Sequence, residues 1–113
     1  MSTRKLLRAH RPAPSVVFAA LGDETRLALV ARLAAGEAWS ITELTRHSRL
    51  TRQAITKHLR VLERAGMVRC VHAGRESRFE LDPRPFSEIE AYIQRVSREW
   101  DAALVRLKMF VEK

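Results

Sequence analysis

One stretch of this 113-residue chain carries side chains that can read the edges of DNA bases. In residues 51–64, the apolar side chains Ile55, Leu59 and Leu62 recur at i, i+4 and i+7 and therefore share one face of a helix. The opposite face is polar and basic, with Gln53, Thr56, Lys57, Arg60 and Arg64. In a major groove, glutamine pairs with adenine, arginine and lysine pair with guanine, and a threonine methyl meets thymine. The pattern therefore indicates a helix that contacts duplex DNA.

The side chains of this helix divide by their expected task. The first turn of such a helix normally enters the groove deepest, so it holds the better base readers. The predicted readers are Arg52, Gln53 and Thr56, with Thr51 beside them as the N-cap residue. Contacts to phosphates set the register of a protein on DNA. The predicted phosphate contacts are Lys57, Arg60 and Arg64.

The element before residues 51–64 distinguishes a DNA-reading helix from an ordinary amphipathic helix with a solvated basic face. Ser40 and Glu43 have the spacing of a capping box. This box predicts a short helix over residues 41–47, followed by a tight turn. The chain therefore places two helices in the order of a helix-turn-helix.

After Gly66, which can end a helix in the left-handed conformation, the periodicity changes. Residues 67–73 and 75–81 alternate apolar and polar side chains on either side of a glycine, which is typical of a β-hairpin. Two short helices, a tight turn and a basic hairpin make a winged helix-turn-helix. The expected fold class is mainly α with a β-hairpin wing.

Three arginines of the hairpin are candidate wing contacts: Arg69, Arg75 and Arg78. Arg75 follows the glycine at the predicted tip, where it can reach phosphates or a narrow minor groove. Charged side chains on an edge strand also protect against aggregation. The same residues can serve both purposes.

Two further helices are predicted upstream. The first covers residues 15–21 and ends at Gly22, and Asp23 caps the second, over residues 24–35. The expected inward stripe of this second helix is Leu27, Val30, Ala31 and Ala34.

A long last helix is predicted from a second capping box, Ser87 with Glu90, to about Val111. Its apolar positions approach a heptad seam and predict a homodimer interface. The interface residues are Ile89, Ile93, Val96, Trp100, Leu104 and Leu107. Packing of this stripe onto the helix-turn-helix core is the alternative, and a helix of about 36 Å exceeds what that core can cover.

The charge of the chain is unevenly distributed. Its net charge is +8, and residues 1–81 hold 15 of the 21 basic and 7 of the 13 acidic side chains, so the whole excess lies there. This distribution favours a polyanionic partner over a mixed solvated surface. Residues 1–14, with Pro12 and Pro14, are predicted to be a flexible basic arm, and residues 15–113 one domain. No apolar run reaches the ~20 residues of a membrane span, so we expect a cytoplasmic protein that binds no membrane.

Other chemistry finds little support. The sequence contains no glycine-rich phosphate loop, paired carboxylates or nucleophile–base set, so no enzyme and no cofactor are expected. Cys70 and His72 alternate on a predicted strand and face one way, but two ligands fall short of a structural zinc site. Two alternatives to a DNA-binding regulator stay open: a metal or redox sensor through Cys70 and His72, and a winged-helix module that binds protein.

The sequence resembles the ArsR family of winged-helix repressors. The resemblance rests on residues 21–37, 41–69 and 74–81, with TKHLRVLERAGMV as its most specific part, and it covers the chain from Phe18 to about Val111. It implies a dimer that represses an operator, that dimerises through its first and last helices, and that releases DNA when a small-molecule inducer binds.

The sequence departs from the metal-sensing members of that family. Those members carry cysteines in the helix before the recognition helix, where residues 40–45 here carry hydroxyl side chains. A second family site uses Asp, His and Glu on the last helix, and no histidine follows His72. Hydroxyls are poor ligands for soft metals, so no metal site is expected and the inducer is unknown.

Overall fold

Five helices and three strands follow one another in the residues that the computed structural model describes, 12–112. Their order is α2 (Pro14–Leu21), α3 (Glu24–Leu33), β1 (Trp39–Ser40), α4 (Ile41–Arg46), α5 (Arg52–Arg64), β2 (Val68–Ala73), β3 (Glu76–Leu81) and α6 (Pro83–Val111). The expected winged helix-turn-helix is confirmed, with α4 and α5 as its two helices. The predicted arm, apart from residues 12–14, lies outside the described residues.

Three helices begin at the side chains that the sequence predicts as N-caps. Asp23, Ser40 and Thr51 each accept a hydrogen bond from the backbone amide three residues on, at 3.0, 3.1 and 3.1 Å. Each bond satisfies an amide that has no partner inside its helix. These caps fix where α3, α4 and α5 start, and therefore the direction in which α5 projects its side chains.

The three strands form one antiparallel sheet in the order β1-β3-β2. The hairpin register runs from Val68 opposite Leu81 to Ala73 opposite Glu76. Gly74 opens its two-residue loop at φ +67°, a conformation that favours glycine. The strand β1, which pairs Trp39 with Phe79, was not predicted because two residues are too few to show an alternating pattern.

The core lies under α5. Ile55, Leu59 and Leu62 are fully buried, as are Leu44 of α4 and Met67 before β2. Burying an aliphatic side chain of this size contributes about 1.5–3 kcal/mol. One face of α5 is thereby fixed against the protein, and the other is left to solvent.

The inward stripe predicted for α3 is wrong. The structure buries Leu29 and Leu33, while Leu27 is 51% exposed. Ala31 and Ala34 are exposed as well, and Val30 is half-buried. Two leucines at i and i+4 remove more apolar area from water than an alanine-rich stripe, so the helix turns its leucine pair inward.

The start predicted for the last helix is also wrong. The helix α6 begins at Pro83, capped by Asp82, and Ser87 is an exposed residue of its second turn. Proline suits the first helical position because its missing N–H would have no partner there. Pro83 and Pro85 therefore both lie inside the first turn of α6.

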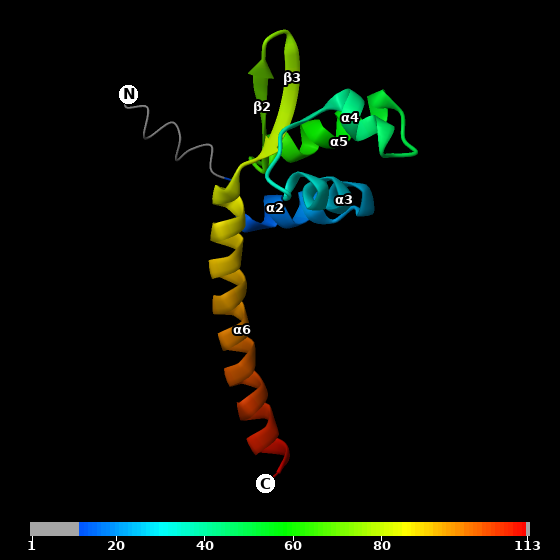
Figure 1. Ribbon diagram of the computed structural model, residues 1–113. Helices are drawn as coiled ribbons and strands as arrows, with labels where there is room; N and C mark the ends of the chain where they lie inside the picture. The colour runs from blue at the N-terminus through cyan, green and yellow to red at the C-terminus, as the bar shows by residue number, and fades with distance from the viewer. Residues whose placement is uncertain (1–11, 113) are drawn as a thin grey trace, which may run out of the picture.

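The helix α6 contains 29 residues, about 43 Å at 1.5 Å per residue. Figure 1 shows it leaving the other helices on the side away from the β2–β3 hairpin. Ile89, predicted in the dimer seam, is buried within the chain itself at 8% exposure, which leaves little of its side chain for a partner. Within residues 12–112, no helix is both long enough and apolar enough to cross a membrane.

Asp82 holds the junction between β3 and α6. Its carboxylate accepts hydrogen bonds from the Arg84 backbone amide at 3.1 Å and from the Arg84 guanidinium at 2.5–3.1 Å. The Asp82 amide in turn donates to the Met67 carbonyl at 2.9 Å. The side-chain hydrogen bonds from Arg84, more than its backbone amide, lower the pKa of the Asp82 carboxyl below 3.8.

Replacing Asp82 by alanine should lower the free energy of unfolding by about 0.5–2 kcal/mol, the usual cost of losing an N-cap. Because the pKa is depressed in the folded state, this stabilisation is complete above 3.8 and is lost as the pH falls through the folded-state pKa. The difference between Asp82→Ala and wild type, measured by urea denaturation, should therefore shrink as the pH drops below about 4. Ser87→Ala is the control and should change stability by less than about 0.5 kcal/mol. A larger cost for Ser87→Ala than for Asp82→Ala would place the cap at Ser87 after all.

Candidate nucleic-acid interface

The polar face of α5 is open to solvent along its whole length. Gln53, Lys57, Arg60 and Arg64 are exposed and lie opposite the buried leucine and isoleucine positions. Thr51 and Arg52 are exposed at the start of the helix, and Thr56 is half-buried. The structure thus brings together on one surface all seven side chains predicted from this helix. That they contact DNA stays a prediction.

Two of the predicted base readers already form hydrogen bonds within the chain. The Arg52 Nη1 donates to Thr42 Oγ1 on α4 at 2.6 Å. The Thr56 hydroxyl donates to the Arg52 carbonyl at 2.7 Å, so its methyl is the group left for a base. Thr42 was not predicted to take part, because its contact with Arg52 exists only once the turn has brought α4 and α5 together.

Gln53 and Lys57 are the side chains of this face with no hydrogen bond or ion pair to any residue between 12 and 112. They are separated by four positions and stand one above the other on the helix. Both therefore present their full hydrogen-bonding capacity to an incoming molecule.

Arg60 and Arg64 make weak local contacts. Arg60 pairs with Glu63 at 3.0 Å, and Arg64 Nε donates to the Arg60 carbonyl at 3.3 Å. An exposed ion pair of this kind contributes about 0–1 kcal/mol. A phosphate can replace such partners at little cost.

The three hairpin arginines have different surroundings. Arg75 is exposed in the loop at the tip. Arg69 pairs across the hairpin with Glu80 at 2.8 Å. Arg78 is engaged by Glu43 at 3.1 Å, by Glu76 at 3.2 Å and by the Ala38 carbonyl at 3.0 Å.

The Arg78 guanidinium joins the wing to the start of α4 and to the residue before β1, and it holds these elements together. Of the three arginines, Arg75 is the one in the loop at the tip. That these arginines contact DNA stays a prediction.

Arg26 contacts α5 on the side of that helix that faces the protein. Arg26, near the start of α3, donates through Nε to the Ala20 carbonyl at 2.5 Å and through Nη2 to the Ala19 carbonyl at 3.4 Å. These carbonyls belong to the last turn of α2, where helix carbonyls lack partners. Its Nη1 lies 3.3 Å from Nδ1 of His58 on α5. One guanidinium thus joins α2, α3 and α5.

His58 is half-buried on the flank of α5, and its Nδ1 is the ring atom that faces the Arg26 guanidinium. The Asp23 carboxylate lies 3.8 Å from the same nitrogen. The backbone amide of Arg26 is the main cause that lowers the pKa of Asp23 below its usual value.

Cys70 is half-buried on β2 opposite Phe79. Between residues 12 and 112, no three His, Cys, Asp or Glu side chains are grouped in a way that could hold a metal ion. Two hydroxyl side chains of residues 40–45 are used in the local structure. Ser40 caps α4, and the Thr45 hydroxyl donates to the Ile41 carbonyl.

Two short helices, a wing and an exposed basic face on the second helix define a winged helix-turn-helix DNA-binding protein. A family model described as a helix-turn-helix domain matches residues 21–71. The chain is 32% identical over 99 residues to the HTH-type transcriptional regulator Rv2034 of Mycobacterium tuberculosis, and the match covers 88% of this chain and 89% of the relative.

Solved structures agree. An ArsR-like transcriptional regulator from Rhodococcus sp. RHA1 is 34% identical with a TM-score of 0.76, over 86% of this chain and 91% of that one. The ArsR family transcriptional regulator RHA00566 is 29% identical with a TM-score of 0.69, over 77% and 89%. The chain belongs to the ArsR family of helix-turn-helix transcriptional regulators. It is a DNA-binding protein and not an enzyme.

Replacing Arg26 by methionine keeps the apolar stem but removes the donors to Ala20 and His58. Leaving such groups without a partner should lower the free energy of unfolding by about 1–3 kcal/mol, measured by urea denaturation. Arg46→Met, on an exposed arginine in the last turn of α4, is the matched control and should cost less than about 0.5 kcal/mol. Equal stability of the two variants would contradict the claim that the hydrogen bonds of Arg26 stabilise the contact between α2 and α5.

Proposed function

We propose that this regulator is a homodimer that reads a specific duplex operator and represses a nearby gene. The observation that carries the proposal is the polar face of α5, where Gln53 and Lys57 have no partner within residues 12–112. A free glutamine side chain can pair with adenine in the major groove, and a free lysine can contact a backbone phosphate. The readers are Arg52, Gln53 and the Thr56 methyl, with Thr51 at the helix start.

Phosphate contacts come from the outer part of the same surface. Lys57, Arg60 and Arg64 lie further along α5, and Arg75 extends from the tip of the wing. These groups lie outside the first turn of α5, which holds the base readers, and this placement suits side chains that set the register on the DNA backbone. Arg78, engaged by two carboxylates, is left out of this set.

The proposed interface with a second subunit lies on the outer part of α6, from Ile93 onward. From Ile93 onward, its apolar side chains have little cover in the protomer: Ile93 is 48% exposed, Trp100 64%, Leu104 55% and Leu107 58%. Val96, on the same stripe, is half-buried. Soluble monomers rarely expose so continuous an apolar surface, and a second copy of the same helix matches it by symmetry.

Repression and the absence of a metal complete the proposal. A dimer that occupies an operator blocks other proteins from the same DNA, and this needs no surface beyond α5, the wing and α6. Hydroxyl side chains at residues 40–45 favour control by something other than a soft metal. The proposed means of release is a small-molecule inducer.

Base reading and phosphate binding should separate in two variants. Gln53→Ala should weaken binding to the cognate operator by about 1–3 kcal/mol and leave binding to random duplex nearly unchanged. Arg64→Ala should weaken both duplexes alike. For wild type, the log–log dependence of affinity on salt should have a slope near about −7, for about 8 neutralised phosphates per dimer. Fluorescence anisotropy with labelled duplexes at several salt concentrations measures all three quantities. A slope near zero would contradict DNA binding, and equal losses on both duplexes for Gln53→Ala would contradict its role as a reader.

Dimerisation should control operator affinity from a distance. Trp100→Ala removes a large aromatic from the proposed interface, which typically costs about 2 kcal/mol or more at such a site. Because the two α5 helices must meet half-sites about 34 Å apart, a monomer loses the gain from binding both. Trp100→Ala should therefore sediment as monomer at concentrations where wild type is dimeric and should bind the operator weakly.

The matched control is Arg98→Ala, since Arg98 lies on the opposite side of α6 from Trp100. This variant should stay dimeric and keep close to wild-type affinity. A Trp100→Ala protein that remains dimeric would move the interface elsewhere on the surface.

A further inference from the structure

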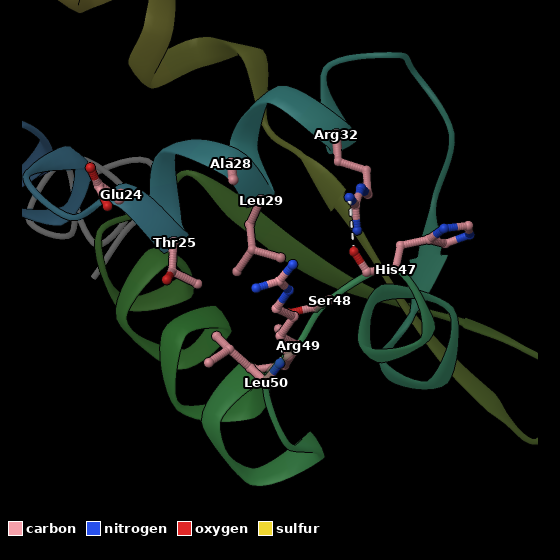
Figure 2. Close-up of a pocket in the computed structure, with 10 residues that line it drawn as sticks. Glu24, Thr25, Ala28, Leu29, Arg32, His47, Ser48, Arg49 and Leu50 are labelled. Atoms are coloured by element: carbon pink, nitrogen blue, oxygen red, sulfur yellow. Dashed lines mark hydrogen bonds between the residues drawn. The ribbon is translucent and has the colours of Figure 1, made fainter.

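A cavity of about 250 Å³ opens between α3 and the turn that joins α4 to α5 (Figure 2). Neither the proposed DNA surface nor the proposed dimer surface uses it. Its walls come from three elements: α3, the turn of residues 47–50 and the first turns of α5. A molecule bound there would touch the segment that sets where the recognition helix begins.

One end of the cavity is cationic. Arg32 is held in place there, since its Nη2 donates to the His47 carbonyl at 3.3 Å and its guanidinium lies 5.7 Å from the centre of the Trp39 ring. Figure 2 shows the Arg49 side chain extending from the turn towards α3. Within residues 12–112, Arg49 has no hydrogen bond or ion pair, so its donors face the cavity unpaired.

The middle of the cavity is apolar, and the other end is acidic. Leu29, Leu50 and Ile55 line the middle, and Leu29 and Ile55 belong to the buried core. Glu24, in the first turn of α3, lines the far end. The arrangement is amphipathic, with guanidinium donors, an apolar floor and then a carboxylate.

We propose that this cavity binds a small amphipathic monocarboxylate. Guanidinium groups bind carboxylates through paired, charge-assisted hydrogen bonds, and Arg49, unpaired in the wall of the cavity, offers such donors, with Arg32 lining the same cavity. The apolar body of the ligand lies over Leu29 and Leu50. Glu24 repels a second carboxylate at the far end, so the site discriminates against dicarboxylates. A volume below the 300–1,000 Å³ of drug-sized sites limits the ligand to a small molecule.

Binding of this ligand opposes DNA binding. The bound carboxylate neutralises positive charge immediately before the amino terminus of α5, which in the proposed function lies against an anionic duplex. Occupation of the cavity also fixes the turn through Ser48 and Leu50. By linkage, whatever the ligand does to operator affinity, the operator does equally to ligand affinity. The antagonism between ligand and DNA rests on the proposed function, whereas the ligand site itself does not.

The experiment uses phenylacetate as the probe, with phenylacetamide and 1,4-phenylenediacetate as neutral and dianionic controls of similar shape. Titrations followed by amide NMR shifts on the DNA-free protein should show saturable changes around residues 47–50 with phenylacetate, at a Kd of about 1 mM or lower. Both controls should bind at least about tenfold more weakly, since each lacks or opposes the single charge-assisted contact. Arg49→Gln should lose about tenfold in phenylacetate affinity, while Arg46→Gln, which removes a nearby charge outside the cavity, should match wild type.

Equal binding of phenylacetate and phenylacetamide, equal binding by Arg49→Gln and wild type, or no shifts near residues 47–50 would each overturn the ligand site. The regulatory half is tested separately, by operator affinity with and without saturating phenylacetate. Wild type should lose affinity several-fold and Arg49→Gln should not change, and an unchanged wild type would overturn the antagonism. Failure of the proposed function is a different result, namely no operator binding by the ligand-free wild type.

Discussion

The orientation of α5 in this regulator depends on the guanidinium of Arg26. This side chain belongs to α3, donates to a carbonyl in the last turn of α2 and reaches His58 on α5. Apolar packing of Ile55, Leu59 and Leu62 supplies most of the energy that holds α5 down, but packing alone allows a helix to slide or rotate by small amounts. Directional hydrogen bonds at a fixed distance do not. The exposed face of α5 is therefore presented at a defined angle relative to α2, and α2 packs against the base of α6.

Polar side chains in the rest of the molecule divide into those with a partner and those without one. Asp82 and Arg84, Arg78 and Glu43, and Arg69 and Glu80 pair with each other and hold strands and helices in register. Gln53, Lys57 and Arg49 find no partner within residues 12–112. Groups that stay unpaired in the folded chain are available to bind another molecule. Basic composition by itself does not make that distinction, since Arg78 and Arg75 are three residues apart and have different surroundings.

The sequence predicts the bounds and the buried face of α5 well for a physical reason. Helical periodicity depends only on near neighbours, and three large aliphatic residues at i, i+4 and i+7 leave little doubt about which face is buried. The stripe of α3 was predicted wrongly because Leu27 and the alanines offered a competing periodic pattern, which the leucine pair outweighs by size. Ser87 and Asp82 both satisfy the rule for an N-cap, and the structure selects Asp82, whose carboxylate accepts from the Arg84 amide. The bonds of Arg26, the ion pairs of Arg78 and the strand β1 join residues distant in sequence, so no local pattern could have indicated them.

The helix α6 belongs to two folding units at once. Its first turns, with Ile89 and the Asp82 cap, are part of the protomer core, whereas the residues beyond Ile93 have no partner in the protomer to bury their apolar stripe. An isolated helical segment of about 18 residues is only marginally stable in water. In the proposed dimer a second copy buries this stripe, so in a dilute, monomeric protein the outer part of α6 should unravel while the winged core stays folded. The amount of helix in this protein then becomes a function of its concentration, and the unwound segment of a surplus subunit is open to proteases that a paired subunit resists.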